Sequence, residues 1–326
     1  MNKRRKLTVG FCMSLLFGFL PARTVYAIEG GESAIGENVI TMIARNSLGQ
    51  IYQYCSGTVI APRLVVTAKH CFPLVDSEPV MGSVTDISFP GVEFSQSVAT
   101  AKVLKLVTTP GAYTVNSDDL AIVVTASDLP VLGNIRLATK EDIERFRTTN
   151  PTVITYGYGS SALSLKMQTT PLKMRNKFVP NRNNLPNESF SIDYISPTTY
   201  SCGGDSGGPS FVLENDTMVY VGPTSSSNRE GCASGKVGTF TLNGTALAYR
   251  TELFETAKQA VLELQQLEEL KKKEDTEKAA KAKEDAENAA KQQLLKKKKV
   301  VTCVRGASQK RVVGVNAKCP VGYKKK

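Results

Sequence analysis

The stretch Cys-Gly-Gly-Asp-Ser-Gly-Gly-Pro at residues 202–209 decides how the rest of the chain is interpreted. So many glycines around Ser206 are not typical of a helix or a core strand, because glycine adopts backbone conformations closed to other residues and lets a substrate approach closely. A serine hydroxyl is a weak nucleophile, and it needs a base to take its proton and donors for the oxyanion that forms. The stretch therefore predicts a nucleophilic serine whose base lies elsewhere in the chain.

The base has one candidate, because His70 is the single histidine in 326 residues. It lies in Thr67-Ala68-Lys69-His70-Cys71, directly after the apolar run 64–66. The ordinary alternative is a core or surface histidine with no chemical role. This motif and Gly-Asp-Ser-Gly-Gly-Pro together resemble the chymotrypsin/trypsin family of serine proteases, in which the first motif is Thr-Ala-Ala-His-Cys. Lys69 is the one departure.

The resemblance implies an all-β fold of two antiparallel six-stranded β-barrels with a Ser/His/Asp triad between them. Ser206 would be the nucleophile and His70 the general base. Asp119, which leads into an apolar strand as in the family's Asp-Ile-Ala-Leu, would orient the imidazole. Its neighbour Asp118 is expected to be a solvated residue. The backbone N–H groups of Gly204 and Ser206 would form the oxyanion hole.

The N-terminus has the three parts of a secretory signal peptide. Residues 3–6 are basic, residues 7–20 are apolar, and Val25 and Ala27 offer small side chains three positions and one position before a cut after Ala27. Residues 1–27 are therefore predicted to be a signal peptide, and the protein to be secreted and extracellular. The alternative is a retained anchor, but the apolar run is shorter than the ~20 residues that a span needs.

The chain that begins at Ile28 resembles the Ile-Val-Gly-Gly terminus of activated family members. The resemblance implies that the freed amino group of Ile28 pairs with Asp205, as an N-terminal latch on the oxyanion hole. The alternative is that Ile28 only starts a strand beside a processing site.

Tyr200 lies six residues before the nucleophile, at the position that forms the floor of the specificity pocket in this family. Trypsin-like members carry an aspartate there, and Tyr200 cannot supply that charge. Ser225, Ser227 and Gly238 are assigned to the rest of the pocket. We expect cleavage after small or medium uncharged residues, not after Lys or Arg.

Of the seven cysteines, Cys12 belongs to the leader, and the remaining six suit an oxidising compartment and three disulfides. The resemblance implies Cys55–Cys71 beside the histidine and Cys202–Cys232 beside the serine, and Cys303–Cys319 is expected to staple the C-terminal end. One histidine and paired cysteines leave no ligand cluster, so neither a metal nor another cofactor is expected.

After the protease domain, predicted over 28–258, the composition changes. Residues 251–299 contain no Gly or Pro and carry apolar residues at helical spacing, which predicts a long helix. We interpret 259–299 as a charged helical spacer, with a coiled coil as the alternative. Residues 300–326 form a basic, cysteine-containing tail with two short strands. The net charge of +11 is the sum of +5 in 1–27, +11 in 296–326 and −5 between them, so the basic charge belongs to the two ends.

The sequence therefore predicts a secreted, monomeric serine endopeptidase that acts on a protein or peptide substrate through an acyl-enzyme. Its tail is expected to bind an anionic cell-envelope polymer or a membrane surface, which would make the protein envelope-associated; a merely solubilising tail is the alternative. Nucleic-acid binding is not expected. The competing function is a catalytically weak or inactive protease homologue that acts as an envelope-tethered binding protein. A third interpretation makes the tail the main function and the protease its vehicle.

Overall fold

The computed structural model describes residues 28–326 apart from 29, 38, 48–49, 73, 76–77, 80–83, 88–100, 112–117, 132–134, 160–170, 182–184, 197–198 and 228–240. The predicted signal peptide and the pocket residue Gly238 lie outside the described residues. The chain divides into two compact units, Met1–Lys258 and Gln259–Lys326.

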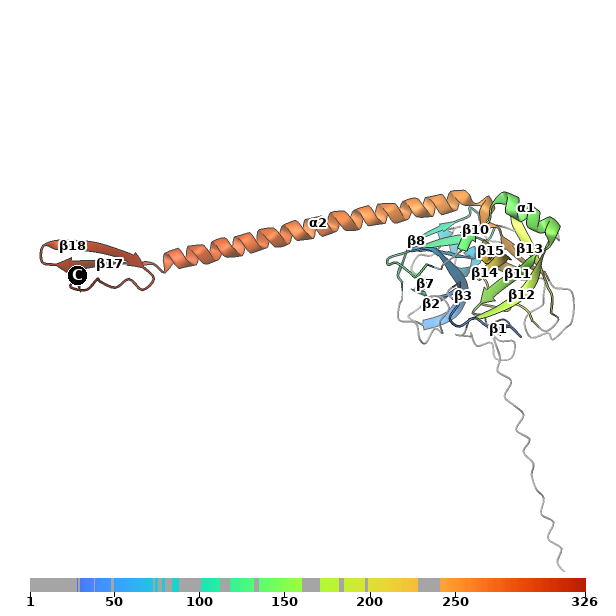
Figure 1. Ribbon diagram of the computed structural model, residues 1–326, viewed down its shortest axis with the longest axis horizontal. Coiled ribbons are helices and arrows are strands. Elements are labelled where there is room, and N and C mark those ends of the chain that lie inside the picture. The colour runs from blue at the N-terminus through green and yellow to red at the C-terminus, as the bar shows by residue number, and fades with distance from the viewer. Residues whose placement is uncertain are drawn as a thin grey trace, which may run out of the picture. The chain divides into compact units, whose positions relative to one another are not determined.

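The first half of the larger unit is a six-stranded antiparallel sheet in the order β7-β2-β3-β4-β9-β8 (Figure 1). Its strands are β2 (Thr41–Ser47), β3 (Gln50–Ala61), β4 (Leu64–Thr67), β7 (Val84–Ile87), β8 (Val103–Thr108) and β9 (Ala121–Thr125). Runs of β-branched residues favour these strands, and β4 and β9 are buried along their whole length. A two-stranded pair, β5 (Leu74–Val75) and β6 (Glu78–Pro79), lies between β4 and β7 in the chain.

The second half contains a closed ring of six antiparallel strands. They are β11 (Thr152–Gly157), β12 (Leu172–Val179), β13 (Ser189–Tyr194), β14 (Pro209–Glu214), β15 (Thr217–Ser227) and β16 (Thr241–Thr245). The ring closes because β12 pairs with both β11 and β13. Two short strands join it at the side, β1 (Glu32–Ser33) on β12 and β10 (Ile135–Leu137) on β15.

The mostly-β fold and one closed six-stranded barrel are thereby confirmed. The second predicted barrel is present as a six-stranded sheet, but among the described residues no pairing joins its edge strands β7 and β8, so its closure stays a prediction. Each half has its own apolar core, one around Phe178 and Phe190 and the other around Val65 and Val123.

Helix α1 (Lys140–Thr149) lies in the segment between the two halves. A capping box begins it: the Thr139 hydroxyl accepts from the backbone N–H of Asp142, and the Asp142 carboxylate accepts from the N–H of Thr139. The helix ends at Asn150, which adopts the left-handed conformation.

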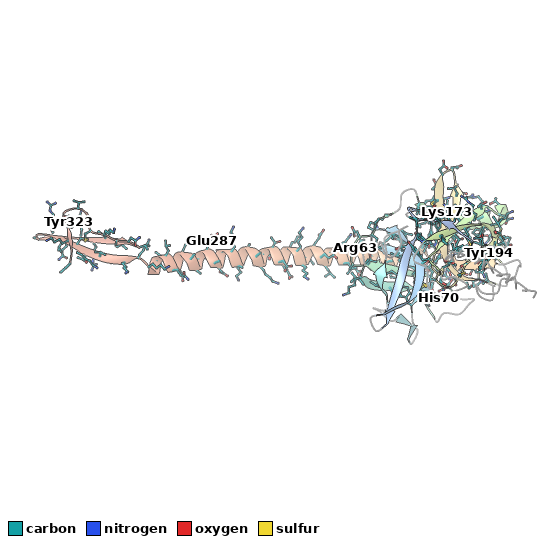
Figure 2. The ribbon with its side chains drawn as sticks, turned by 90° about the horizontal axis from the view of Figure 1, so that it is seen from below. Arg63, His70, Lys173, Tyr194, Glu287 and Tyr323 are labelled. Carbon is teal, nitrogen blue, oxygen red and sulfur yellow. A yellow bond between two sulfur atoms is a disulfide. The ribbon has the colours of Figure 1, made fainter. Side chains whose placement is uncertain are left out.

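Helix α2 (Thr251–Lys296) is the long helix that the sequence predicted. Its expected apolar seam is buried at Leu253 and Ala257, but Leu267 is 62% exposed, so the seam ends earlier than the spacing indicated. From residue 265 onward every described helical residue is exposed, as is seen for Glu287 in Figure 2.

The tail folds as a three-stranded antiparallel sheet, with β17 (Lys299–Arg305) between β18 (Ser308–Gly314) and β19 (Lys324–Lys325). The Cys303–Cys319 disulfide crosses this unit, which is too small to build an apolar core of its own.

Candidate active site

His70 lies on a single helical turn, Lys69–Cys71, that directly follows β4 (Figure 2 labels its side chain). A disulfide between Cys55 and Cys71 ties this turn to β3, with a Cα–Cα distance of 6.0 Å. The Thr67 hydroxyl donates to the carbonyl oxygen of Ser56 at 2.7 Å and adds a second tie to the same strand. The turn is therefore held at both ends while the His70 side chain stays partly exposed.

Asp119 accepts two hydrogen bonds from His70. Its Oδ2 lies 2.6 Å from the ring Nδ1, and its Oδ1 accepts from the His70 backbone N–H at 2.8 Å. Asp119 is completely buried and His70 is partly exposed. With Nδ1 facing Asp119, Nε2 is the ring nitrogen on the side away from that carboxylate, as a base that exchanges a proton with a nucleophile requires.

Two hydroxyl groups from the second half hold Asp119 in place. Ser225 on β15 donates to Asp119 Oδ2 at 2.5 Å, and the Asp119 backbone N–H donates to the Thr245 hydroxyl at 2.9 Å. Ser225 was predicted only as part of the specificity pocket, and the structure places its hydroxyl on Asp119. Thr245 was missed, because a single threonine at the end of a strand carries no local signal of a contact with residue 119.

Ser206 lies in the turn before β14, next to the strand that carries Cys55. Its carbonyl oxygen accepts from the backbone N–H of Ser56 at 2.8 Å and lies 3.8 Å from Cys71 Sγ. Gly207 has a φ of +79°, and a Cβ there would come within 2.1 Å of the Thr67 hydroxyl. The glycine after Ser206 is thus required twice, for its backbone conformation and for the close approach of the turn that carries His70.

The buried Ser56 hydroxyl bridges two backbone groups beside the predicted oxyanion hole. It donates to the carbonyl oxygen of Gly204 at 2.9 Å and accepts from the N–H of Tyr158 at 2.8 Å. Gly204 has a φ of +95°, a conformation that favours glycine. Ser56 did not stand out in the sequence, because its role depends on residues about 100 and 150 positions away.

Asp205 is fully buried, and its carboxylate accepts from the backbone N–H groups of Cys202 at 2.7 Å and Gly159 at 2.8 Å. Burial raises the pKa of Asp205 to about 7, against the opposing effect of these bonds and of one from Ser201. A Cβ at Gly157 would lie 1.9 Å from the Asp205 carboxylate and one at Gly159 2.6 Å. The Gly-Tyr-Gly motif at 157–159 therefore makes room for this carboxylate.

Ile28, the other member of the predicted latch, has a completely buried side chain in the core of the closed barrel. Its carbonyl oxygen accepts from the N–H of Gly31 at 2.9 Å. The residue before it lies outside the described part, so the pairing of a free Ile28 amine with Asp205 stays a prediction.

The predicted pocket is described only in part. Tyr200 is 8% exposed, which fits a side chain that fills the interior of the domain. Ser227 ends β15, and Gly238 lies outside the described residues. Cys202 is disulfide-bonded, and its predicted partner Cys232 lies outside the described residues as well.

Within the described part of the chain, one group of metal-ligating residue types is compact: Cys55, His70 and Cys71, whose candidate ligand atoms lie within 4.8 Å of one another. The two cysteines share a disulfide, so neither sulfur is a thiolate that could ligate a metal. This group does not fit a metal ion.

Among the described residues, no helix combines the length and the apolar character that a membrane crossing requires.

Fold and site together define a two-part β-protein in which an aspartate-bound histidine lies beside a glycine-flanked serine. A family model described as Trypsin matches residues 28–247. A relative named Trypsin, from Saccharopolyspora erythraea, is 30% identical over 221 residues, which cover 65% of this chain and 92% of the relative. The chain belongs to the trypsin family of serine proteases.

Proposed function

We propose that this protein is a secreted serine endopeptidase that acts through Ser206, His70 and Asp119. The single observation that carries the proposal is the short contact between His70 Nδ1 and the buried Asp119 carboxylate, beside the turn that holds Ser206. His70 would take the Ser206 proton as Ser206 Oγ attacks the peptide carbonyl carbon, and Asp119 would stabilise the imidazolium.

In this proposal His70 next passes the proton to the leaving amine, and an acyl-enzyme remains on Ser206. Water then attacks the ester with His70 again as the base, which releases the acid and restores Ser206. The N–H groups of Gly204 and Ser206 would bind the oxyanion, and one such donor accounts for about 3 kcal/mol of transition-state stabilisation in related sites.

Substrate preference belongs to the same proposal. Tyr200 is buried at the predicted pocket floor and carries no charge that could pair with a basic side chain. We therefore expect small or medium uncharged residues before the cleaved bond. A peptide library would test this, and fastest cleavage after Lys or Arg would contradict it.

The activity is tested with a fluorophosphonate probe, which reacts with an activated serine. Purified secreted protein is labelled beside Ser206→Ala, and its N-terminus is sequenced. Labelling of the natural chain alone, with Ile28 as its first residue, would support the endopeptidase, the signal peptide and the latch. Absence of labelling on a correctly processed chain would favour the alternative, a non-catalytic binding protein.

We further propose that the tail binds an anionic polymer of the cell envelope. Residues 296–326 hold eleven basic and no acidic side chains, so the positive charge has no internal counterpart among side chains. One face of the tail sheet, which carries Cys303 and Lys310, is occupied: Cys303 is bonded to Cys319, and Lys310 Nζ lies 5.8 Å from the centre of the Tyr323 ring (labelled in Figure 2).

The other face of the tail sheet is open. In the observed register Arg311 is opposite Thr302 and Lys324 is opposite Val304, and side chains of Thr302 and Val304 lie on the face away from Cys303. Arg311 and Lys324 are both exposed. Two exposed cations on one face of the sheet suit a polymer of repeated negative groups.

The test compares the full-length protein with R311Q/K324Q for binding to immobilised polyphosphate. We expect binding that weakens as salt rises, because exposed charges are screened, and a severalfold loss in the double variant. Retention on anionic vesicles but not on polyphosphate would replace the polymer with a membrane surface. Equal binding by both proteins would contradict a role for this face.

A further inference from the structure

Thr109 contacts three residues beside the pair of His70 and Asp119. It is buried and directly follows β8. Its hydroxyl donates to the carbonyl oxygen of Asp118 at 3.1 Å, and its backbone N–H donates to that of Leu120 at 3.3 Å. Thr109 therefore binds the residues on either side of Asp119.

Lys69 connects Thr109 to the turn that carries His70. Its side chain is 1% exposed, and Nζ donates to the carbonyl oxygen of Thr109 at 2.5 Å and to that of Gly111. A buried lysine is uncommon unless its donors are occupied. Lys69 directly precedes His70, so these bonds fix the turn that carries His70 against the segment of Thr109. That same segment binds both neighbours of Asp119.

Arg250 binds the side chain of Asp118, whereas Thr109 binds its backbone carbonyl. Its Nε and Nη2 both donate to Asp118 Oδ2, the former at 2.9 Å, and its Nη2 also lies 3.8 Å from Glu188. Asp118 was expected to be a solvated neighbour of Asp119. This prediction is wrong, because its carboxylate pairs with Arg250 and only about one fifth of its side chain is exposed. Arg250 directly precedes α2, so the ion pair joins the start of that helix to the segment that carries Asp119.

We infer that Lys69, Thr109, Asp118 and Arg250 act as one positioning network for His70 and Asp119. None of the four touches the ring or the carboxylate of the pair in the contacts described above. They act through the backbone: Lys69 and Thr109 set the distance between the two segments, and Arg250 fixes the segment before Asp119. The inference rests on the proposed function, because the pair matters for catalysis only if His70 is the base.

The central test is Thr109→Val, which removes the hydroxyl and keeps the shape. We expect kcat to fall about tenfold or more, with KM changed less than twofold, because a small displacement of catalytic groups lowers the rate steeply. Thr109→Ser should restore most of the loss. The matched control is Thr125→Val at the far end of β9, where another buried threonine donates to a backbone carbonyl.

Arg250 is tested in the same way, with Arg250→Met against Arg63→Met. Arg63, labelled in Figure 2, also forms an ion pair, with Asp128 at 2.7 Å. We expect a fall in kcat in the first variant only, and a smaller fall in Arg250→Lys. Equal falls in both methionine variants would show a general loss of stability and overturn the inference.

An NMR measurement reports the position of the His70 ring independently of the protein's stability and of its activity. Because the chain has one histidine, ¹⁵N-histidine labelling yields the signals of His70 alone. The proton that His70 Nδ1 shares with Asp119 should give a low-field signal in the natural protein and in Thr125→Val, and a shifted or lost signal in Thr109→Val and Lys69→Met. An unchanged signal in the last two variants would overturn the network. This measurement holds even if the natural protein proves inactive, which would refute only the proposed function.

Discussion

At the scale of single residues, Ser56 shows how a buried hydroxyl can support the oxyanion hole without touching a substrate. Its Oγ satisfies both the Gly204 carbonyl and the Tyr158 N–H. Ser56→Ala would remove this partner from the buried Tyr158 N–H and from the partly buried Gly204 carbonyl, and an unsatisfied buried polar group costs about 1–3 kcal/mol. We expect a comparable loss of unfolding free energy in chemical denaturation.

Ser56→Ala should also slow acylation, because the backbone around Gly204 would lose one of its anchors. The rate of reaction with the fluorophosphonate probe measures this step. Thr58→Val is the control, since Thr58 lies on the same strand as Ser56 and its buried hydroxyl donates to the carbonyl oxygen of Val39. If both variants react as fast as the natural protein, Ser56 has only a structural role.

In the chain that keeps its predicted leader, Asp205 should make the free energy of unfolding depend on pH. Its pKa is raised to about 7 in the folded state, above the ~4 of an exposed aspartate, so the folded state holds this proton more tightly than the unfolded state. The contribution of Asp205 to the free energy of unfolding is complete below pH 4 and is lost as the pH rises through 7. The total loss is up to roughly 4 kcal/mol. Denaturation of the chain with its leader should show this slope, and Asp205→Asn should lack it.

Cleavage before Ile28 should abolish that loss. A free amino group paired with Asp205 would favour the carboxylate and lower the pKa of Asp205. The processed chain should then gain stability as the pH rises toward about 4 and keep it between pH 4 and 7, because Asp205 is ionised in both states there. The same slope in processed and unprocessed chains would contradict the latch.

At the scale of elements, Asp142 fixes the start of α1. Its carboxylate closes the capping box with Thr139 and binds Arg136 and Arg145, and these contacts hold the pKa of Asp142 well below its usual range. Asp142→Ala should lower the unfolding free energy by about 1–3 kcal/mol, mostly through the lost cap, because the two arginines are substantially exposed.

The contribution of Asp142 to the free energy of unfolding should be present above about pH 4 and be lost as the pH falls further. A depressed pKa favours the folded state only while the carboxylate is ionised. Thermal unfolding at pH 7 and at pH 2.5 checks this, with Glu141→Ala as a control in the same helical turn. A difference between natural protein and Asp142→Ala that persists undiminished at pH 2.5 would contradict the argument.

The elements illustrate what the sequence could reveal. Strands β2, β3 and β11 contain β-branched runs, and α2 lies in a long segment without Gly or Pro. His70, Asp119 and Ser206 could be predicted as candidates because their motifs are local. The contacts of Thr109, Ser225 and Arg250 were not, because each joins residues distant in sequence and none has a pattern around it.

At the scale of the whole molecule, the end of the protease unit is set by packing and not by the end of the helix. Helix α2 runs through the boundary between Lys258 and Gln259 without a break. Leu253 and Ala257 are buried, whereas the helix beyond residue 265 is exposed. The exposed part contributes little apolar burial, so removing it should cost the protease unit little stability.

A chain that ends at Lys258 should therefore keep the melting temperature and probe reactivity of the full-length protein while losing its retention on polyphosphate. A chain that ends at Tyr249 lacks both Arg250 and the buried turn of α2, and it should lose probe reactivity about tenfold or more because the segment before Asp119 loses its ion pair. Arg250→Met in the chain that ends at Lys258 separates the ion pair from the lost helical packing, since it removes only the guanidinium. Loss of reactivity already at the Lys258 end would show that the spacer or tail supports the active site, and would place the catalytic unit's boundary further along α2.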